Sequence, residues 1–192
     1  MNYRITSRSA VFSECGRYRY SLSRSLEGGN GKRVMFLMLN PSDAGADRDD
    51  PTVRRCAGFT RWWGFTHFDV GNLYGLIATD PVDLIVRIHD FDAEGPDNQR
   101  HLMAMMGDAD LVVPAWGANA AEPRIYRRAS AVSASLQMLR EGGVPVRDLG
   151  LTKGGHPRHP LFVPYNQALE DWPGYPARPG LEGRVHLAGD AR

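Results

Sequence analysis

The chain has little of what marks several large classes of protein. It has only two cysteines, Cys15 and Cys56, and they lack the Cys-x-x-Cys spacing of an iron–sulfur or structural zinc site. So few cysteines also argue against a secreted disulfide framework and favour the reducing cytoplasm. No apolar run approaches the roughly 18 residues of a membrane span. Residues 1–8 are polar and lack the apolar core of a signal peptide.

A strong charge of one sign is also missing. The formal net charge is +1, so no global basic field indicates a nucleic-acid partner, and only local patches can carry that argument. The length of 192 residues and the hydrophobic fraction of 42% fit one globular domain. We place this domain at residues 1–172. Residues 173–192 are rich in Pro and Gly and are predicted to form a tail.

Short apolar segments alternate with helical ones along most of the chain. Buried strands are predicted at 33–39, 68–74, 110–116 and 144–149, and helices at 51–64, 81–88, 98–106 and 122–141. Residues 1–32 predict an N-terminal edge strand or hairpin. We therefore expect an α/β fold, a three-layer α/β/α sandwich with a central four-stranded parallel sheet.

Polar or glycine-rich residues follow each predicted strand. They are 40–43 after the first strand, Asn72 and Tyr74 in the second, Trp116 at the end of the third, and 152–161 after the fourth. Ligand sites in parallel sheets lie beyond the carboxyl ends of the strands. We therefore expect these four segments to meet at one edge of the sheet.

Two asparagines are candidates for contacting a substrate. Asn40, held by the stiff ring of Pro41, can orient a water for attack on a sugar carbon, although capping a turn is the commoner role of such an Asn. Asn72 can recognise the edge of a base, or it can hold a loop backbone. Tyr74 can stack on a base, although a core position is commoner. The expected base- or substrate-binding residues are Pro41, Ser42, Asn72, Tyr74 and Trp116.

The segment 154–161 concentrates chemically active side chains. A protonated histidine can stabilise charge on a leaving base, and a neutral one can donate a hydrogen bond to it, so His156 and His159 are both catalytic candidates. The two histidines lack a third ligand at a recognisable spacing, and no metal or other cofactor is expected. Arg158 can hold a phosphate, and Leu161 can act as a wedge in a base stack.

An acidic loop and a basic helix face follow Asn40. Asp43, Asp47, Asp49 and Asp50 lie in the loop, and one of them can polarise a water, with Asp43 best placed by position. A solvated or Mg²⁺-binding loop is an alternative, and Asp49 or Asp50 is expected to cap the helix that begins at Pro51. Arg54 and Arg55, together with Lys153, are expected to contact phosphates, although a solvated charged face is the commoner arrangement.

In their order, these motifs resemble those of the uracil-DNA glycosylase superfamily. Residues 39–42 are similar to its water-positioning motif, which is an Asn-Pro-Gly turn in mismatch-specific members, and Asn72 resembles its base-reading Asn. Residues 115–120 are similar to its Trp-Gly-x-x-Ala strand ending. Residues 156–161 are similar to its His-Pro-Ser-Pro-Leu loop, with one extra residue. A closer resemblance, over roughly residues 17–165, is to a bacterial and phage family of unknown function with Leu-Asn-Pro-Ser, Asp-Asp-Pro-Thr, Ala-Trp-Gly and His-Pro-Leu motifs.

The resemblance implies a monofunctional DNA glycosylase that flips a nucleotide into a pocket. Asn40 would place the water, with or without Asp43, and His159 or His156 would steady the leaving base. The water motif lacks the Asp of the most active uracil enzymes, so a modified base is expected, such as a bulky phage-type pyrimidine removed in anti-phage defence. DNA is the expected partner, without a membrane or an obligate protein partner. The alternatives are a hydrolase or transferase of free nucleosides or nucleotides, and a non-catalytic binding module.

Overall fold

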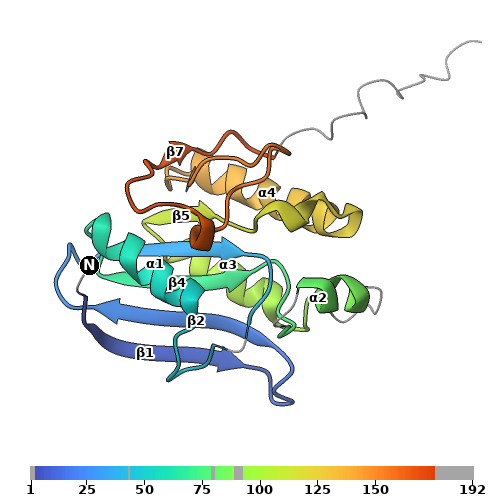
Figure 1. Cartoon of the computed structure of the whole chain (residues 1–192), viewed down its shortest axis with the longest axis horizontal. Helices are drawn as coiled ribbons and strands as arrows, with labels where there is room; N and C mark the ends of the chain where they lie inside the picture. Colours follow the sequence, from blue (N-terminus) through green and yellow to red (C-terminus); the bar gives the residue numbers. More distant parts are fainter. Residues whose placement is uncertain (1–2, 43, 79–80, 89–92, 176–192) are drawn as a thin grey trace, which may run out of the picture.

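A computed structural model describes residues 3–42, 44–78, 81–88 and 93–175 (Figure 1). The strands are β1 (Ile5–Phe12), β2 (Arg19–Leu26), β3 (Arg33–Met38), β4 (His67–Asn72), β5 (Leu111–Pro114), β6 (Arg147–Asp148) and β7 (Glu170–Asp171). The α-helices are α1 (Pro51–Trp62), α2 (Pro81–Arg87), α3 (Asn98–Gly107) and α4 (Pro123–Glu141). Two short 3-10 helices are η1 (Ala118–Ala121) and η2 (Pro160–Phe162). None of the described helices is both long and apolar enough to cross a membrane.

The central sheet is mixed, with five strands in the order β1-β2-β4-β3-β5. Strand β3 is parallel to β4 and β5, while β2 pairs antiparallel with both β1 and β4. The N-terminal hairpin is therefore confirmed, but the prediction of a four-stranded parallel sheet is wrong. The hairpin supplies the antiparallel strands by covering the free edge of β4, a long-range pairing that no local sequence pattern specifies.

The predicted fourth strand is the second departure. Only Arg147–Asp148 of the expected 144–149 segment is a strand, and it pairs antiparallel with β7. Its link to the main sheet is a single parallel bridge between Val146 and Val112. The preceding Pro145 has no backbone N–H to donate, so the ladder cannot extend back along this segment.

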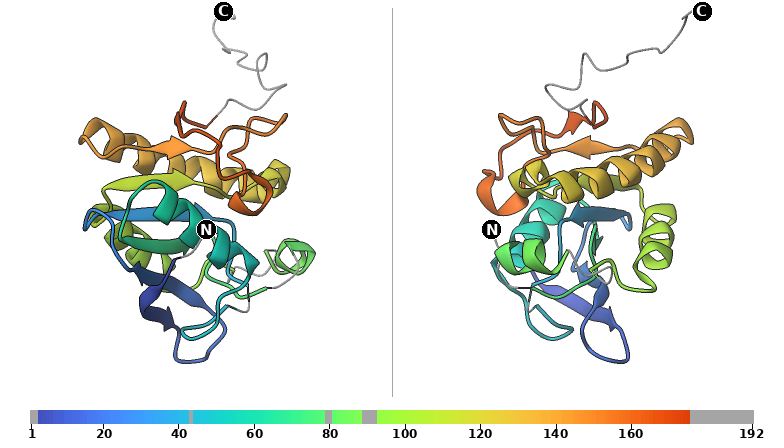
Figure 2. Two further views of the ribbon diagram at one scale, coloured as in Figure 1. Left: turned by 60° about the vertical axis from the view of Figure 1, so that its left-hand side comes forward. Right: turned by 90° about the vertical axis from the view of Figure 1, so that its right-hand side faces the viewer.

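Helices pack against both faces of the sheet. Alternate residues of β3 point to opposite faces. Val34 and Phe36 share a core with Phe59 of α1, whereas Met35 and Leu37 share a core with residues of α3 and α4 such as Leu102 and Ile125. The views in Figure 2 place the β1–β2 hairpin and α4 at opposite sides of the molecule.

Helix α1 begins as its sequence predicts. Asp50 is the N-cap, its Oδ1 accepting a hydrogen bond from the backbone N–H of Val53 at 2.7 Å, and Pro51 occupies the first helical position. At the other end of the chain, the buried Trp172 packs on Trp116. The tail predicted from residue 173 lies mainly outside the described residues, so the division at residue 172 stays a prediction.

Candidate active site

A cavity of about 420 Å³ lies at the carboxyl ends of the three parallel strands. The ends are level because Met38 pairs with Asn72 and Leu37 pairs with Pro114. The segment after β6 closes the cavity, fixed by a 2.9 Å hydrogen bond from the backbone N–H of Gly117 to the carbonyl of Pro157. The four predicted segments therefore do meet at one edge.

The cavity gathers some of the predicted site residues and not others. Those that line it are Asn40, Ser42, Asn72, Trp116, Arg158, His159 and Leu161. Those that do not are Pro41, Tyr74, Lys153, His156, Arg54 and Arg55. Asp43 lies outside the described residues. Several of the residues that do not line the cavity make contacts that fix the position of residues that do.

Asn40 has a fixed amide. Its Nδ2 donates to the carbonyl of Ala78 at 2.7 Å and to that of Pro41 at 3.0 Å. The Pro41 carbonyl also accepts from the backbone N–H of Ala78, so Pro41 serves the turn and not the cavity. With both amide hydrogens directed to carbonyls, the Asn40 Oδ1 is the atom left to accept from a ligand or a water.

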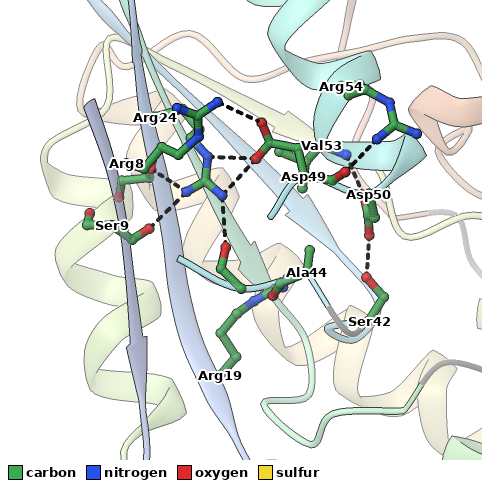
Figure 3. A network of polar contacts seen from close by, with 12 residues as sticks. Arg8, Ser9, Arg19, Arg24, Ser42, Ala44, Asp49, Asp50, Val53 and Arg54 are labelled. Carbon is green, nitrogen blue, oxygen red and sulfur yellow. Dashed lines mark hydrogen bonds and ion pairs between the residues drawn. The ribbon is translucent and has the colours of Figure 1, made fainter. Parts of the chain in front are cut away.

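The loop after Asn40 is anchored to β2 by two buried arginines (Figure 3). Arg24, whose side chain is fully buried, donates to Asp49 Oδ1 at 2.8 Å and to the carbonyl of Gly45 at 2.9 Å. Arg19 donates to the carbonyl of Ala44 and also lines the cavity. Because a buried guanidinium must be paired, this network fixes the path of the acidic loop.

Asp50 turns this loop back to the cavity. Its Oδ2 accepts a hydrogen bond from the Ser42 hydroxyl, while its Oδ1 caps α1 (Figure 3). Asp50 also lines the cavity. One carboxylate thus joins the helix start to the residue that follows Asn40-Pro41.

Asn72 is the most unusual polar group of the site. It is only 1% exposed, and neither its Oδ1 nor its Nδ2 has a hydrogen-bond partner in the described part of the chain. Its backbone carbonyl is held by Asn98 Nδ2 at 3.0 Å. A buried polar group left without a partner costs about 1–3 kcal/mol. A ligand that pairs with the amide would recover this free energy.

Two aromatic candidates differ in their surroundings. Trp116 lines the cavity, packs edge-on against Trp172 with ring centroids 5.6 Å apart, and its Nε1–H also lacks a partner among the described residues. Tyr74 is a core residue whose hydroxyl donates to the carbonyl of Arg124 at 3.4 Å. Burial raises the pKa of Tyr74 to about 12, so its hydroxyl stays neutral.

The two histidines occupy different environments. His159 lines the cavity, and its Nδ1 accepts from the backbone N–H of Leu161 at 3.3 Å. Burial lowers the pKa of His159 to about 4, with the charge of Asp50 acting in the opposite direction. The ring is therefore neutral at pH 7, and the accepting Nδ1 leaves the proton on Nε2.

His156 is buried away from the cavity. Its Nδ1 is 2.9 Å from the Tyr175 hydroxyl, and its backbone N–H donates to Thr152 Oγ1 at 3.2 Å. Burial lowers its pKa as well. Of the two histidines that the sequence proposes, only His159 lines the cavity.

The predicted phosphate-binding residues also differ in their surroundings. Arg55 donates to the carbonyls of Pro160 and Val163, and its guanidinium lies 3.7 Å from the centre of the Tyr165 ring. It therefore fastens α1 to the histidine segment. Arg54 and Lys153 are exposed, and Arg158 lines the cavity.

The sequence reasoning missed several residues of the cavity. Phe162 lines it and is 77% exposed, and the adjacent Leu161 was the signal that could have found it. Arg19 lies on β2, whose place beside β4 was not foreseen. The polar and aromatic cavity residues that were not proposed are Arg19, Thr52, Asn119, Thr152 and Phe162. Asp50, which also lines the cavity, was proposed as a helix cap and as one of four aspartates able to polarise a water. No group of three or more His, Cys, Asp or Glu residues suited to a metal ion occurs in the described residues.

Comparison with protein families matches residues 19–161 to the family described as "Protein of unknown function (DUF1643)". The chain belongs to the DUF1643 family. The DUF1643 match runs from the start of β2 into η2 and includes every residue that lines the cavity except Phe162. Comparisons with curated proteins and with solved structures found no match.

Proposed function

We propose that this DUF1643 protein is a DNA glycosylase that hydrolyses the N-glycosidic bond of a modified base and leaves an abasic site. The observation that carries the proposal is the cavity at the strand ends, which joins Asn40, the unpartnered amide of Asn72 and the neutral His159. The distant relation to the uracil-DNA glycosylase superfamily and its three-layer architecture belong to this proposal.

Six cavity residues have a chemical role in the proposed reaction. The base, flipped out of the duplex, pairs with the amide of Asn72, which offers both a donor and an acceptor. Asn40 Oδ1 holds the attacking water next to the sugar C1′. His159 Nε2–H donates to the oxygen of the departing base, where negative charge develops. Leu161 and the exposed Phe162 fill the gap in the base stack, and Arg158 contacts a phosphate.

The substrate is proposed to be a pyrimidine that carries a bulky substituent. The cavity of about 420 Å³ falls within the usual range of ligand sites and exceeds the needs of one bare ring. Asn40 is followed by Pro41 and Ser42 in place of the Asp of the most active uracil enzymes, which argues against plain uracil. Removal of such bases from invading DNA would serve anti-phage defence in the cytoplasm.

An abasic-site assay tests the proposal. The protein is incubated with duplexes that carry a panel of modified bases and with phage genomic DNA, and abasic sites are cleaved with hot alkali. We expect strand breaks with at least one DNA, loss of breaks with Asn40→Ala, and unchanged DNA binding by that variant. Asn166→Ala is the matched control, since Asn166 is exposed and does not line the cavity. The absence of breaks across the whole panel would contradict the proposal.

The near-neutral charge of the chain favours one second candidate, hydrolysis or transfer on free nucleosides or nucleotides. The two functions differ in their response to salt. Duplex binding weakens steeply with salt because counterions are released, whereas nucleoside binding does not. A third possibility, a non-catalytic binding module, predicts binding without products in either assay.

A further inference from the structure

We infer that Asp50 is a further catalytic residue of the proposed cleavage, the carboxylate that takes the proton of the attacking water. This inference rests on the proposed function. The motif around Asn40 has no carboxylate at the position that the most active uracil enzymes use, and the fold brings one in from the start of α1.

The first observation is position. Asp50 is the only carboxylate among the described residues that line the cavity, where the other ionisable side chains are those of Arg19, Arg158 and His159. It lines the same cavity as Asn40, and its negative charge favours the protonated form of His159. A negative charge at this place also stabilises the cationic sugar that forms as a glycosidic bond breaks.

The second observation is orientation. The Ser42 hydroxyl donates to Oδ2 and the backbone N–H of Val53 donates to Oδ1, so both oxygens are held. Each carboxylate oxygen has two lone-pair sites, so each can still accept from a water. The loop that carries Asp50 is in turn fixed, because its neighbour Asp49 pairs with the buried Arg24.

The proposed step balances as a simple hydrolysis. The water oxygen bonds to C1′ as the C1′–N bond breaks, and the electron pair of that bond leaves with the base. One water proton passes to Asp50, which later releases it to solvent, and the departing base takes up a proton from solvent. Asn40 orients the water, and Asp50 accepts its proton.

The test uses Asp50→Asn in the full chain. Asn is as good an N-cap as Asp, so the helix start is kept while the negative charge is lost. In single-turnover excision from the DNA found to be a substrate, we expect the rate to fall about 100-fold or more, the usual range for a general base. DNA affinity and melting temperature should stay near those of the wild type.

Two comparison variants make the result specific. Asp47→Asn removes the same charge from an exposed place in the same loop and should excise at the wild-type rate. Asp43→Asn tests the carboxylate next to the Asn40 motif. A wild-type rate in Asp50→Asn overturns the inference, as does a loss confined to Asp43→Asn.

A rescue experiment covers the case in which Asp50→Asn does not fold. Gly is tolerated at an N-cap almost as well as Asp, so Asp50→Gly keeps the helix and opens space for a small carboxylate. Restoration of excision by added formate supports the inference, and a folded Asp50→Gly protein that formate does not restore overturns it. If the wild-type protein excises no base from any DNA in the panel, the proposed function itself is contradicted.

Discussion

Asn98 Nδ2 donates hydrogen bonds to the backbone carbonyls of Asn72 and Leu73, at 3.0 and 3.3 Å, while the side chain of Asn72 bonds to nothing in the described structure. Two buried asparagines of adjoining elements thus have opposite roles. Asn98 holds the end of β4 in place, and Asn72 presents an unused amide at the cavity.

This difference predicts opposite effects of one substitution. Asn72→Leu removes an unpaired buried amide, so the free energy of unfolding should be unchanged or rise by about 1 kcal/mol. Asn98→Leu removes the Asn98 donor from the carbonyls of Asn72 and Leu73 and should lower it by about 1–3 kcal/mol. This loss should come mainly from the Asn72 carbonyl, because the Leu73 carbonyl still accepts from Arg128 Nε at 3.1 Å. Urea denaturation measures both. Excision should be lost in Asn72→Leu, and a strong loss of stability in that variant would show that its amide has a structural partner.

Substitutions of the neighbouring residues Arg55 and Arg54 should change different properties of the protein. Arg55→Ala frees the histidine segment from α1, so we expect a loss of about 1–3 kcal/mol in stability and a lower excision rate, with little change in DNA affinity. Arg54→Ala, at an exposed position, should keep stability and weaken DNA binding at low salt. Urea denaturation and fluorescence anisotropy separate the two. A pure affinity loss in Arg55→Ala would restore its role as a phosphate contact.

The buried environment of His159 predicts a pH dependence of stability. Folding lowers its pKa from 6.5 to about 4, so between these values the unfolded chain binds the proton more readily than the folded chain. The stabilising contribution is therefore complete above pH 6.5 and is lost as the pH falls toward 4. The melting temperature of the wild type should drop more steeply over this range than that of His159→Asn. If the melting temperatures of the two proteins fall in parallel with pH, the lowered pKa of His159 is contradicted.

Phe162 is 77% exposed beside the cavity, and Met138 is 72% exposed on α4 away from it. Neither side chain packs in the core, so both Ala variants should keep their stability within about 0.5 kcal/mol. If Phe162 stacks on bases, Phe162→Ala should bind substrate DNA more weakly by about 1–3 kcal/mol, the usual value of one aromatic stack. Met138→Ala should bind as the wild type does. Equal affinities in an anisotropy titration would remove Phe162 from the interface.

Gly117 and Gly16 both have positive φ, at 80° and 70°, but only Gly117 faces a neighbour. A Cβ at Gly117 would lie 3.4 Å from the Cβ of His159, whereas a Cβ at Gly16 would meet open space. Backbone strain should cost both Ala variants about 1 kcal/mol or more. Only Gly117→Ala should also slow excision, because the strained residue would lie against His159. Equal excision rates would show that this contact does not position the histidine.

The helices and the start of the site follow from local sequence. Asp50 and Pro51 fix where α1 begins, because capping and the φ of proline are decided within one turn of chain. The polar residues after β3, β4 and β5 were correctly placed at one edge, since parallel strands carry their carboxyl ends to the same side. The hairpin position and the short β6 could not be predicted in this way, because strand pairing joins residues far apart in the chain.

The sequence by itself determined which side chains could do chemistry: two asparagines, two histidines, an acidic loop and an apolar Leu161. The tertiary structure alone decided among them. It brought His159 to the cavity and turned His156 toward Tyr175, placed Arg55 in contact with the carbonyls of the histidine segment, and brought Asp50 to the cavity that Asn40 also lines. The physical reason is that local composition sets the chemistry of a group, whereas burial and distance across the fold set its partners and its pKa.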